Sequence, residues 1–161
     1  MSMIGESVAR QFDASFQMWR ETIEAVPDGD WQAESAPELC PARWAYHGIQ
    51  AAEFHCFHAP GDFEWDHPFG VNWATNDVAS LPGKPATLGY LDEVARRVAD
   101  MLRATSDRDF LETTSWGEHT RPGGNLLGHM LYVLRHNHQH LGELCRLLRE
   151  RGIEQPDWQI G

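Results

Sequence analysis

Apolar residues recur every three or four positions in long segments of this chain, and this periodicity constrains the fold more than any other feature. The first segment, residues 8–26, has one apolar stripe, formed by Val8, Phe12, Phe16, Trp19, Ile23 and Val26. Steps of three and four place side chains on one face of an α-helix, so this segment is predicted to be a long amphipathic helix. The turn residues Pro27, Asp28 and Gly29 are expected to end it.

A second helix is predicted from about Pro41 to His58. Proline is favoured in the first helical turn, where its missing N–H is not needed. The stripe expected to face the core consists of Trp44, His47, Ala51, Phe54 and His58. His47 is therefore expected among core-facing residues.

Two further helices are predicted in the second half of the chain. One opens just after Pro85, with Leu88, Leu91, Val94 and Val98 at helical spacing. The other, which is the longest, is expected from Gly123 or Asn125 to Arg151, and Gly152 can supply a left-handed cap.

Residues 59–85 contain several prolines and glycines, which exclude a continuous helix there. Irregular connections of this length are usually functional or disordered. The segment also carries four large aromatic residues, whose surface prefers to be buried and which therefore argue against disorder: Phe63, Trp65, Phe69 and Trp73. It is expected to form a lid, a pocket wall or a subunit contact, with plain packing as the alternative. Residues 106–122 are expected to form a turn with one helical turn at its start.

The four periodic segments, with no alternating strand pattern, predict an all-α fold. The simplest architecture is a four-helix bundle with a long irregular connection between helices 2 and 3. A length of 161 residues is enough for one domain, so residues 1–161 are expected to form a single unit.

The net charge of −11 opposes binding to nucleic acid or to anionic membranes, because both are themselves negatively charged. No run approaches the roughly 18–20 apolar residues of a membrane span, and a cytoplasmic location is expected. Three widely spaced cysteines without a CxxC pair predict reduced thiols rather than a disulfide framework.

The nine histidines carry the chemical signal. His136 and His140 are four residues apart, so their imidazoles share one helix face and can converge on a single ion, as in HExxH zinc helices. Catalytic zinc-type ions commonly take three protein ligands and keep one position open. His47 is the best third candidate, because it faces inward from another helix. The competing interpretation is that each is a hydrogen-bonded core or surface histidine without a metal.

Other polar residues near this pattern are assigned different roles. His129 and Glu143 lie seven residues from His136 on the same face, and each is a candidate general base or a partner that orients a ligand imidazole. His138 points to the opposite side and is expected to be solvated. His55 is rotated off the second-helix stripe and is not expected to take part. Paired Glu-x-x-His motifs are absent, which sets aside a di-iron carboxylate bundle.

The segments "WAYHGIQAAEF" and "LGHMLYVLRHNHQHLGEL" resemble the DinB/YfiT-like superfamily of four-helix-bundle metalloenzymes over nearly the whole chain. The resemblance implies one divalent metal ion, such as nickel or zinc, on histidines that map onto His47, His136 and His140. Glu143 stands where glutamine is common in the family. Related proteins include thiol transferases that use bacillithiol, mycothiol or glutathione. The resemblance and the abundance of aromatic residues also favour a homodimer.

The function expected from these observations is a metal-dependent transferase or hydrolase. The ion would activate a thiol or water for reaction with a small-molecule substrate, with a low-molecular-weight thiol as the expected cosubstrate. The alternative is a non-catalytic bundle that binds a metal or small ligand as a sensor or dimeric scaffold.

Overall fold

A computed structural model describes residues 2–33, 40–59, 61–113 and 124–161 of the chain. Its regular structure consists of the α-helices α1 (Met3–Ala25), α2 (Pro41–Phe57), α3 (Lys84–Ala104), α4 (Asp107–Leu111) and α5 (Leu126–Glu150), with short 3₁₀ turns η1 (Asp28–Asp30) and η3 (Val78–Ser80). The predicted all-α class is confirmed for these ranges, and no helix within them is long and apolar enough to cross a membrane.

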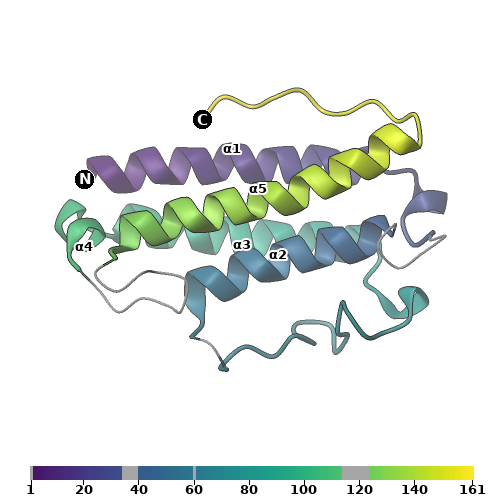
Figure 1. Cartoon of the computed structure of the whole chain (residues 1–161), viewed down its shortest axis with the longest axis horizontal. Coiled ribbons are helices and arrows are strands. Elements are labelled where there is room, and N and C mark those ends of the chain that lie inside the picture. The colour runs from purple at the N-terminus through teal and green to yellow at the C-terminus, as the bar shows by residue number, and fades with distance from the viewer. Residues whose placement is uncertain (1, 34–39, 60, 114–123) are drawn as a thin grey trace.

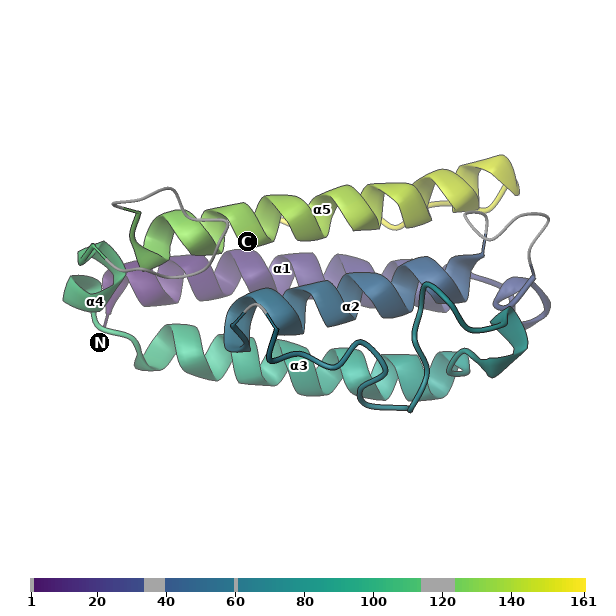
Figure 2. The ribbon, with the colours of Figure 1, turned by 60° about the horizontal axis from the view of Figure 1, so that its bottom comes forward.

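The four long helices lie side by side as a bundle (Figures 1 and 2). α1 and α5 run in one direction, and α2 and α3 run in the other. The main packing pairs are α1 with α3 and α2 with α5. The connection from α2 to α3 returns along the side of the bundle (Figure 2). As predicted, it contains no continuous helix in its described part, where η3 is the only helical turn. The short helix α4 covers the end at which α1 begins.

The helix ends follow from local capping residues. Ser2 caps α1 by accepting the Gly5 N–H, and its hydroxyl donates to Asp107 of α4 at 2.6 Å. Asn125 caps α5 by accepting the Gly128 N–H at 2.9 Å. Gly152, with φ +69°, ends α5 in the left-handed conformation, as predicted.

Three predicted boundaries differ from the structure or lie partly outside its described residues. The second helix ends at Phe57, one residue before the predicted His58, which serves as its C-cap. The longest helix begins after the predicted Asn125, whereas the alternative start, Gly123, lies outside the described residues. Much of the predicted turn at 106–122 also lies outside them, but its opening helical turn is α4.

The prediction of which α2 residues face the core is wrong. Thirteen of the seventeen residues of α2 are buried, so the helix is enclosed on nearly every side. The four that keep partial exposure are Trp44, His47, Phe54 and Phe57. Three of these belong to the stripe expected to face the core. They instead form an edge that faces the connection and α5, because the core contacts of α2 are made by residues such as Ala45, Ile49 and Ala52.

Candidate functional site

Helices α2 and α5 bring four imidazole rings into one contiguous group. The ring centroids of His47 and His140 are 4.6 Å apart, and those of His140 and His136 are also 4.6 Å apart. His55 extends the row, with its centroid 5.0 Å from that of His136. The three histidines predicted as ligands are therefore neighbours, because α2 packs against α5 along this stretch.

Some nitrogen atoms of this group pair with each other, and others have no partner. The Nε2 atoms of His136 and His140 lie 3.1 Å apart and share a hydrogen bond. Two nitrogens bound to one tetrahedral ion at 2.0–2.1 Å would lie about 3.4 Å apart, so this pair is close to the spacing that a shared ion requires. The Nδ1 atoms of His47 and His140 are buried without a hydrogen-bond partner, a state that ligands or water normally relieve.

The donor atoms do not enclose an ion as they stand. Within the described ranges, no group of three or more His, Cys, Asp or Glu side chains has its donors arranged to hold a metal. The residue types and their adjacency fit a three-imidazole ligand set. A shared ion would require side-chain rotation from the arrangement in the structure.

Two imidazoles of the group are held in the neutral form. Burial, together with the nearby imidazoles of His140, His136 and His55, lowers the pKa of His47 to about 3. Burial also lowers the pKa of His140 to about 4, with His136 adding to the effect and Glu143 opposing it. Neutral imidazole offers the lone pair that a metal ion needs, so both side chains are competent ligands at neutral pH.

Indole rings cover one side of the imidazole group. Trp73 stacks on His47, with centroids 3.7 Å apart and an interplanar angle of 25°. Trp65 lies 6.0 Å from the same ring, and Trp44 lies 5.8 Å from the ring of His140. Trp65 and Trp73 come from the connection between α2 and α3. The aromatic residues predicted to form a lid, wall or subunit contact therefore include two that pack on this chain's own histidines.

A buried amide fixes the register of α5 against its neighbours. The Oδ1 atom of Asn137 accepts a hydrogen bond from Trp19 Nε1 at 2.6 Å, and its Nδ2 donates to the carbonyl of Gly48 at 3.2 Å. Gly48 directly follows His47, and Asn137 directly follows His136. The same side chain thus joins the two backbone segments that carry candidate ligands.

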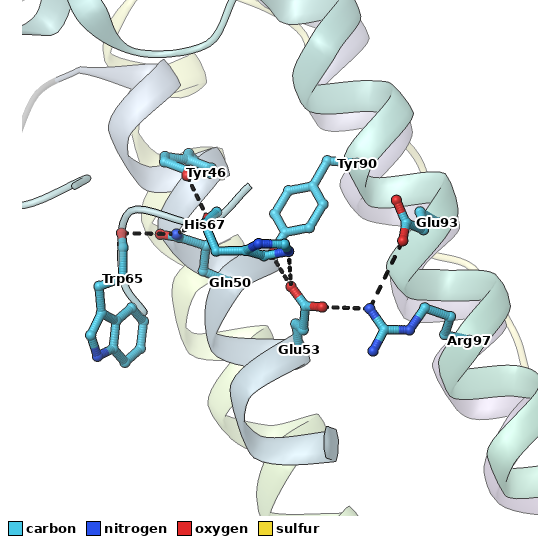
Figure 3. Close-up of polar contacts among 8 residues, drawn as sticks. All are labelled: Tyr46, Gln50, Glu53, Trp65, His67, Tyr90, Glu93 and Arg97. Atoms are coloured by element: carbon cyan, nitrogen blue, oxygen red, sulfur yellow. Dashed lines mark hydrogen bonds and ion pairs between the residues drawn. The ribbon is translucent and has the colours of Figure 1, made fainter. Parts of the chain in front are cut away.

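A second polar cluster lies between α2 and α3 (Figure 3). Glu53 is 1% exposed and accepts hydrogen bonds from the hydroxyl of Tyr90 and the guanidinium of Arg97. His67 of the connection lies 3.9 Å from the same carboxylate. Burial, reinforced by Glu53, raises the pKa of Tyr90. Because the buried Glu53 carboxylate of α2 is hydrogen-bonded to two side chains of α3, this cluster joins α2 to α3. This cluster could not be predicted from motif spacing, because the partners of Glu53 are far from it in the sequence.

The two candidate general bases already have partners. The Nε2 atom of His129 lies 2.7 Å from the carbonyl oxygen of His55. A carbonyl can only accept, so this nitrogen carries the proton and donates it. Glu143 accepts a hydrogen bond from Arg146 Nε at 3.0 Å and remains partly exposed. A base role for either residue stays a prediction.

The structure corrects the placement of two other histidines. His55, which was expected to lie away from the group, is buried and adjacent to His136. The reason is that α5 crosses the face of α2 on which His55 lies. His138, expected to be solvated, is half-buried, with its ring 5.8 Å from that of Trp158 in the C-terminal segment. His58, at the end of the predicted stripe, contacts the ring of Phe63, with centroids 4.9 Å apart.

Comparison with known proteins identifies the family. No curated protein matches the chain. A family model described as the DinB superfamily matches residues 11–144, which include most of α1, all of α2 and α3, and α5 as far as Leu144. This range contains every predicted metal ligand and confirms the family predicted from the histidine motifs. The chain therefore belongs to the DinB superfamily.

Proposed function

We propose that this protein binds one divalent metal ion through His47, His136 and His140 and uses it to transfer a thiol to, or to hydrolyse, a small electrophilic molecule. Membership of the DinB superfamily fits a metal-dependent enzyme. A divalent ion on three imidazoles, with one position open, supplies Lewis acidity that ionises a bound thiol or water near neutral pH. Three imidazoles suit nickel or zinc.

One observation carries this proposal: two helices bring three imidazoles together, and the donors of two of them lie 3.1 Å apart. If these histidines served only to pack the bundle, their ring nitrogens would be expected to bond to backbone or side-chain partners. The buried Nδ1 atom of His47 has none, and the Nε2 atom of His140 is paired with another imidazole, that of His136. Their low pKa values leave them without the positive charge that would repel a cation.

The surrounding side chains prepare the imidazoles for this role. Trp73 and Trp65 keep water from one side of His47, and a drier environment strengthens electrostatic interactions. The hydrogen bond from Asn137 to the carbonyl of Gly48 fixes the register of α5, and with it the position of His136, relative to α2. His136 and Trp44 remain partly exposed, so a small molecule can approach the group from solvent.

Metal binding is tested by comparing His136→Ala with His138→Ala. Both changes remove an imidazole from α5, but His138 lies off the candidate group and serves as the matched control. Zn²⁺ or Ni²⁺ is expected to raise the melting temperature of the wild type and of His138→Ala, because a ligand that binds the folded state stabilises it. His136→Ala should lose most of this increase, and elemental analysis should show less than one ion per chain. Equal metal content in all three proteins would refute the ligand assignment.

Catalysis is tested separately on the metal-loaded protein. Bacillithiol, mycothiol and glutathione are each incubated with a panel of electrophiles, and conjugates are counted by mass spectrometry, with ester and amide hydrolysis measured in parallel. Turnover that disappears in His136→Ala supports the enzyme. Stoichiometric metal without turnover of any thiol or hydrolase substrate would instead support the non-catalytic binding module.

A further inference from the structure

Helix α2 has a buried polar stripe beside the edge that carries His47. Arg43, Tyr46 and Gln50 follow one another at steps of three and four, and are 8%, 0% and 0% exposed. The steps place all three on one face of the helix. Glu53 continues this face toward α3. A buried stripe of this composition is costly unless each polar group has a specific partner.

The partners of this stripe are backbone carbonyls of the connection between α2 and α3. Gln50 Nε2 donates to the carbonyls of Trp65 at 3.1 Å and His67 at 2.6 Å, and the hydroxyl of Tyr46 donates to the same His67 carbonyl at 2.7 Å (Figure 3). These bonds hold the path of the backbone, and they do not depend on the side chains of the connection.

Arg43 makes the contact nearest to the imidazole group. Its guanidinium donates to the carbonyl of Trp73 and, at 3.1 Å, to that of Asn76. The indole of the same Trp73 stacks on His47, which lies one helical turn after Arg43. Arg43 of α2 therefore binds the backbone of Trp73, and the indole of Trp73 covers the imidazole of His47 on the same helix.

The cost of burying Arg43 indicates that its role is more specific than packing. The Nε atom of Arg43 is buried without a hydrogen-bond partner. Within the part of the chain that the structure describes, the Arg43 guanidinium forms no ion pair with a carboxylate. An apolar side chain of similar volume would avoid this desolvation penalty. The two carbonyl contacts to the connection are what the guanidinium gains.

We propose that Arg43 is a positioning residue of the imidazole group: acting through Trp73, it keeps the His47 ring beside that of His140, the position from which the imidazoles can rotate onto one divalent cation. Gln50 supports the same arrangement by holding the backbone of Trp65. This inference rests on the proposed metal site for its functional meaning. The positioning itself is a property of the metal-free protein and is measured there.

The first test uses the metal-free protein and the ring-current shift that a stacked indole imposes on the His47 ring protons, assigned by comparison with His47→Gln. Trp73→Ala defines the shift produced by loss of the indole. Arg43→Met, which keeps an apolar stem, is expected to move the His47 signals at least half as far in the same direction, and Arg43→Lys should restore part of the difference. Arg96→Met, at an exposed arginine of α3, is the matched control and should leave the signals in place.

Unchanged His47 signals in a folded Arg43→Met would overturn the proposal, as would unchanged signals in Trp73→Ala. Circular dichroism checks that each variant is folded. If Arg43→Met does not fold, Arg43→Lys decides, because it keeps the charge but loses the two-pronged contact. An Arg43→Lys protein with wild-type His47 signals would then refute the role.

The second test measures Ni²⁺ affinity by calorimetry. Arg43→Met is expected to weaken binding about tenfold or more, as is common when a residue that orients a ligand is lost. Combining it with Trp73→Ala should add nothing to Trp73→Ala alone, because both act through the same contact. Multiplied losses would show that Arg43 acts elsewhere. A wild type that binds neither Ni²⁺ nor Zn²⁺ would refute the proposed function, whereas the His47 signals would still decide the positioning role.

Discussion

Replacing Gly48 by alanine tests the packing of Trp19 of α1 against α2. A methyl group at this position would lie 2.3 Å from Cη2 and 2.6 Å from Cζ2 of Trp19. Carbon atoms in contact normally stay about 3.5–4.0 Å apart, so the indole would have to move by more than about 1 Å. Trp19 is fully buried, and its Nε1 donates to Asn137 at 2.6 Å, so the surrounding core and this hydrogen bond both oppose the movement.

The expected cost follows from these contacts. Overfilling a packed core costs about 1–3 kcal/mol, and weakening the Trp19 hydrogen bond adds about 1 kcal/mol. The better helix propensity of alanine offsets about 0.5–1 kcal/mol. Gly48→Ala should therefore lower the free energy of unfolding by about 1–3 kcal/mol. With a slope of about 2 kcal/mol per molar urea, the unfolding midpoint should fall by about 0.5–1.5 M.

Gly142→Ala is the matched control, because it makes the same chemical change inside α5. No atom lies within 4 Å of a methyl group at that position, and the residue is exposed. This variant should be more stable than the wild type by about 0.5–1 kcal/mol. Urea titrations of the three proteins, followed by circular dichroism, give the comparison. If Gly48→Ala matches or exceeds the wild type in stability, the argument from the Trp19 contact fails.

Three further predictions concern buried ionisable groups. Glu53→Ala should destabilise the fold by about 1–3 kcal/mol, because the buried hydroxyl of Tyr90 and the partly exposed guanidinium of Arg97 lose their acceptor, whereas Glu93→Ala, at an exposed position of α3, should cost under about 0.5 kcal/mol in the same urea assay. Burial raises the pKa of the Cys56 thiol to about 12, so Cys56 in the folded protein should resist a thiol reagent at pH 8 and react once urea unfolds the chain; rapid labelling in the folded state would contradict this. The pKa values of His47 and His140, about 3 and about 4, lie below the ordinary 6.5. The folded state therefore binds fewer protons than the unfolded state between these values and pH 6.5, and stability of the metal-free protein should fall as the pH falls through this window. His47→Gln should lose less stability than the wild type between pH 7 and pH 5. An equal loss in the two proteins would refute the lowered pKa of His47.

Features set by local geometry were predictable from the sequence. The stripe of α1 was correctly identified, because one face of that helix is buried and the other is polar. The adjacency of His136 and His140 follows from their four-residue spacing on any helix. The cap at Gly152 required only a glycine after the last apolar residue. None of these features depends on which other helix lies nearby.

Features set by tertiary contacts were not predictable. Helix α2 is buried on most of its surface, so no polar face marks which side points outward. The stripe predicted from its apolar residues is, apart from Ala51, the partly exposed edge of the helix. His55 was excluded from the site because it lies off that stripe. The hydrogen bonds from Arg43 and Gln50 to the connection could not be predicted for another reason. Their acceptors are backbone carbonyls, which every residue possesses.

The enclosure of α2 sets how this protein can tolerate or acquire change. Most substitutions on that helix should reduce soluble yield before they alter any reaction, since nearly every position is packed. Trp44, His47, Phe54 and Phe57 are the exceptions. A saturation library confined to these four positions would sample new reactivity at little cost in expression, whereas a library spread over the rest of α2 would return chiefly aggregated protein.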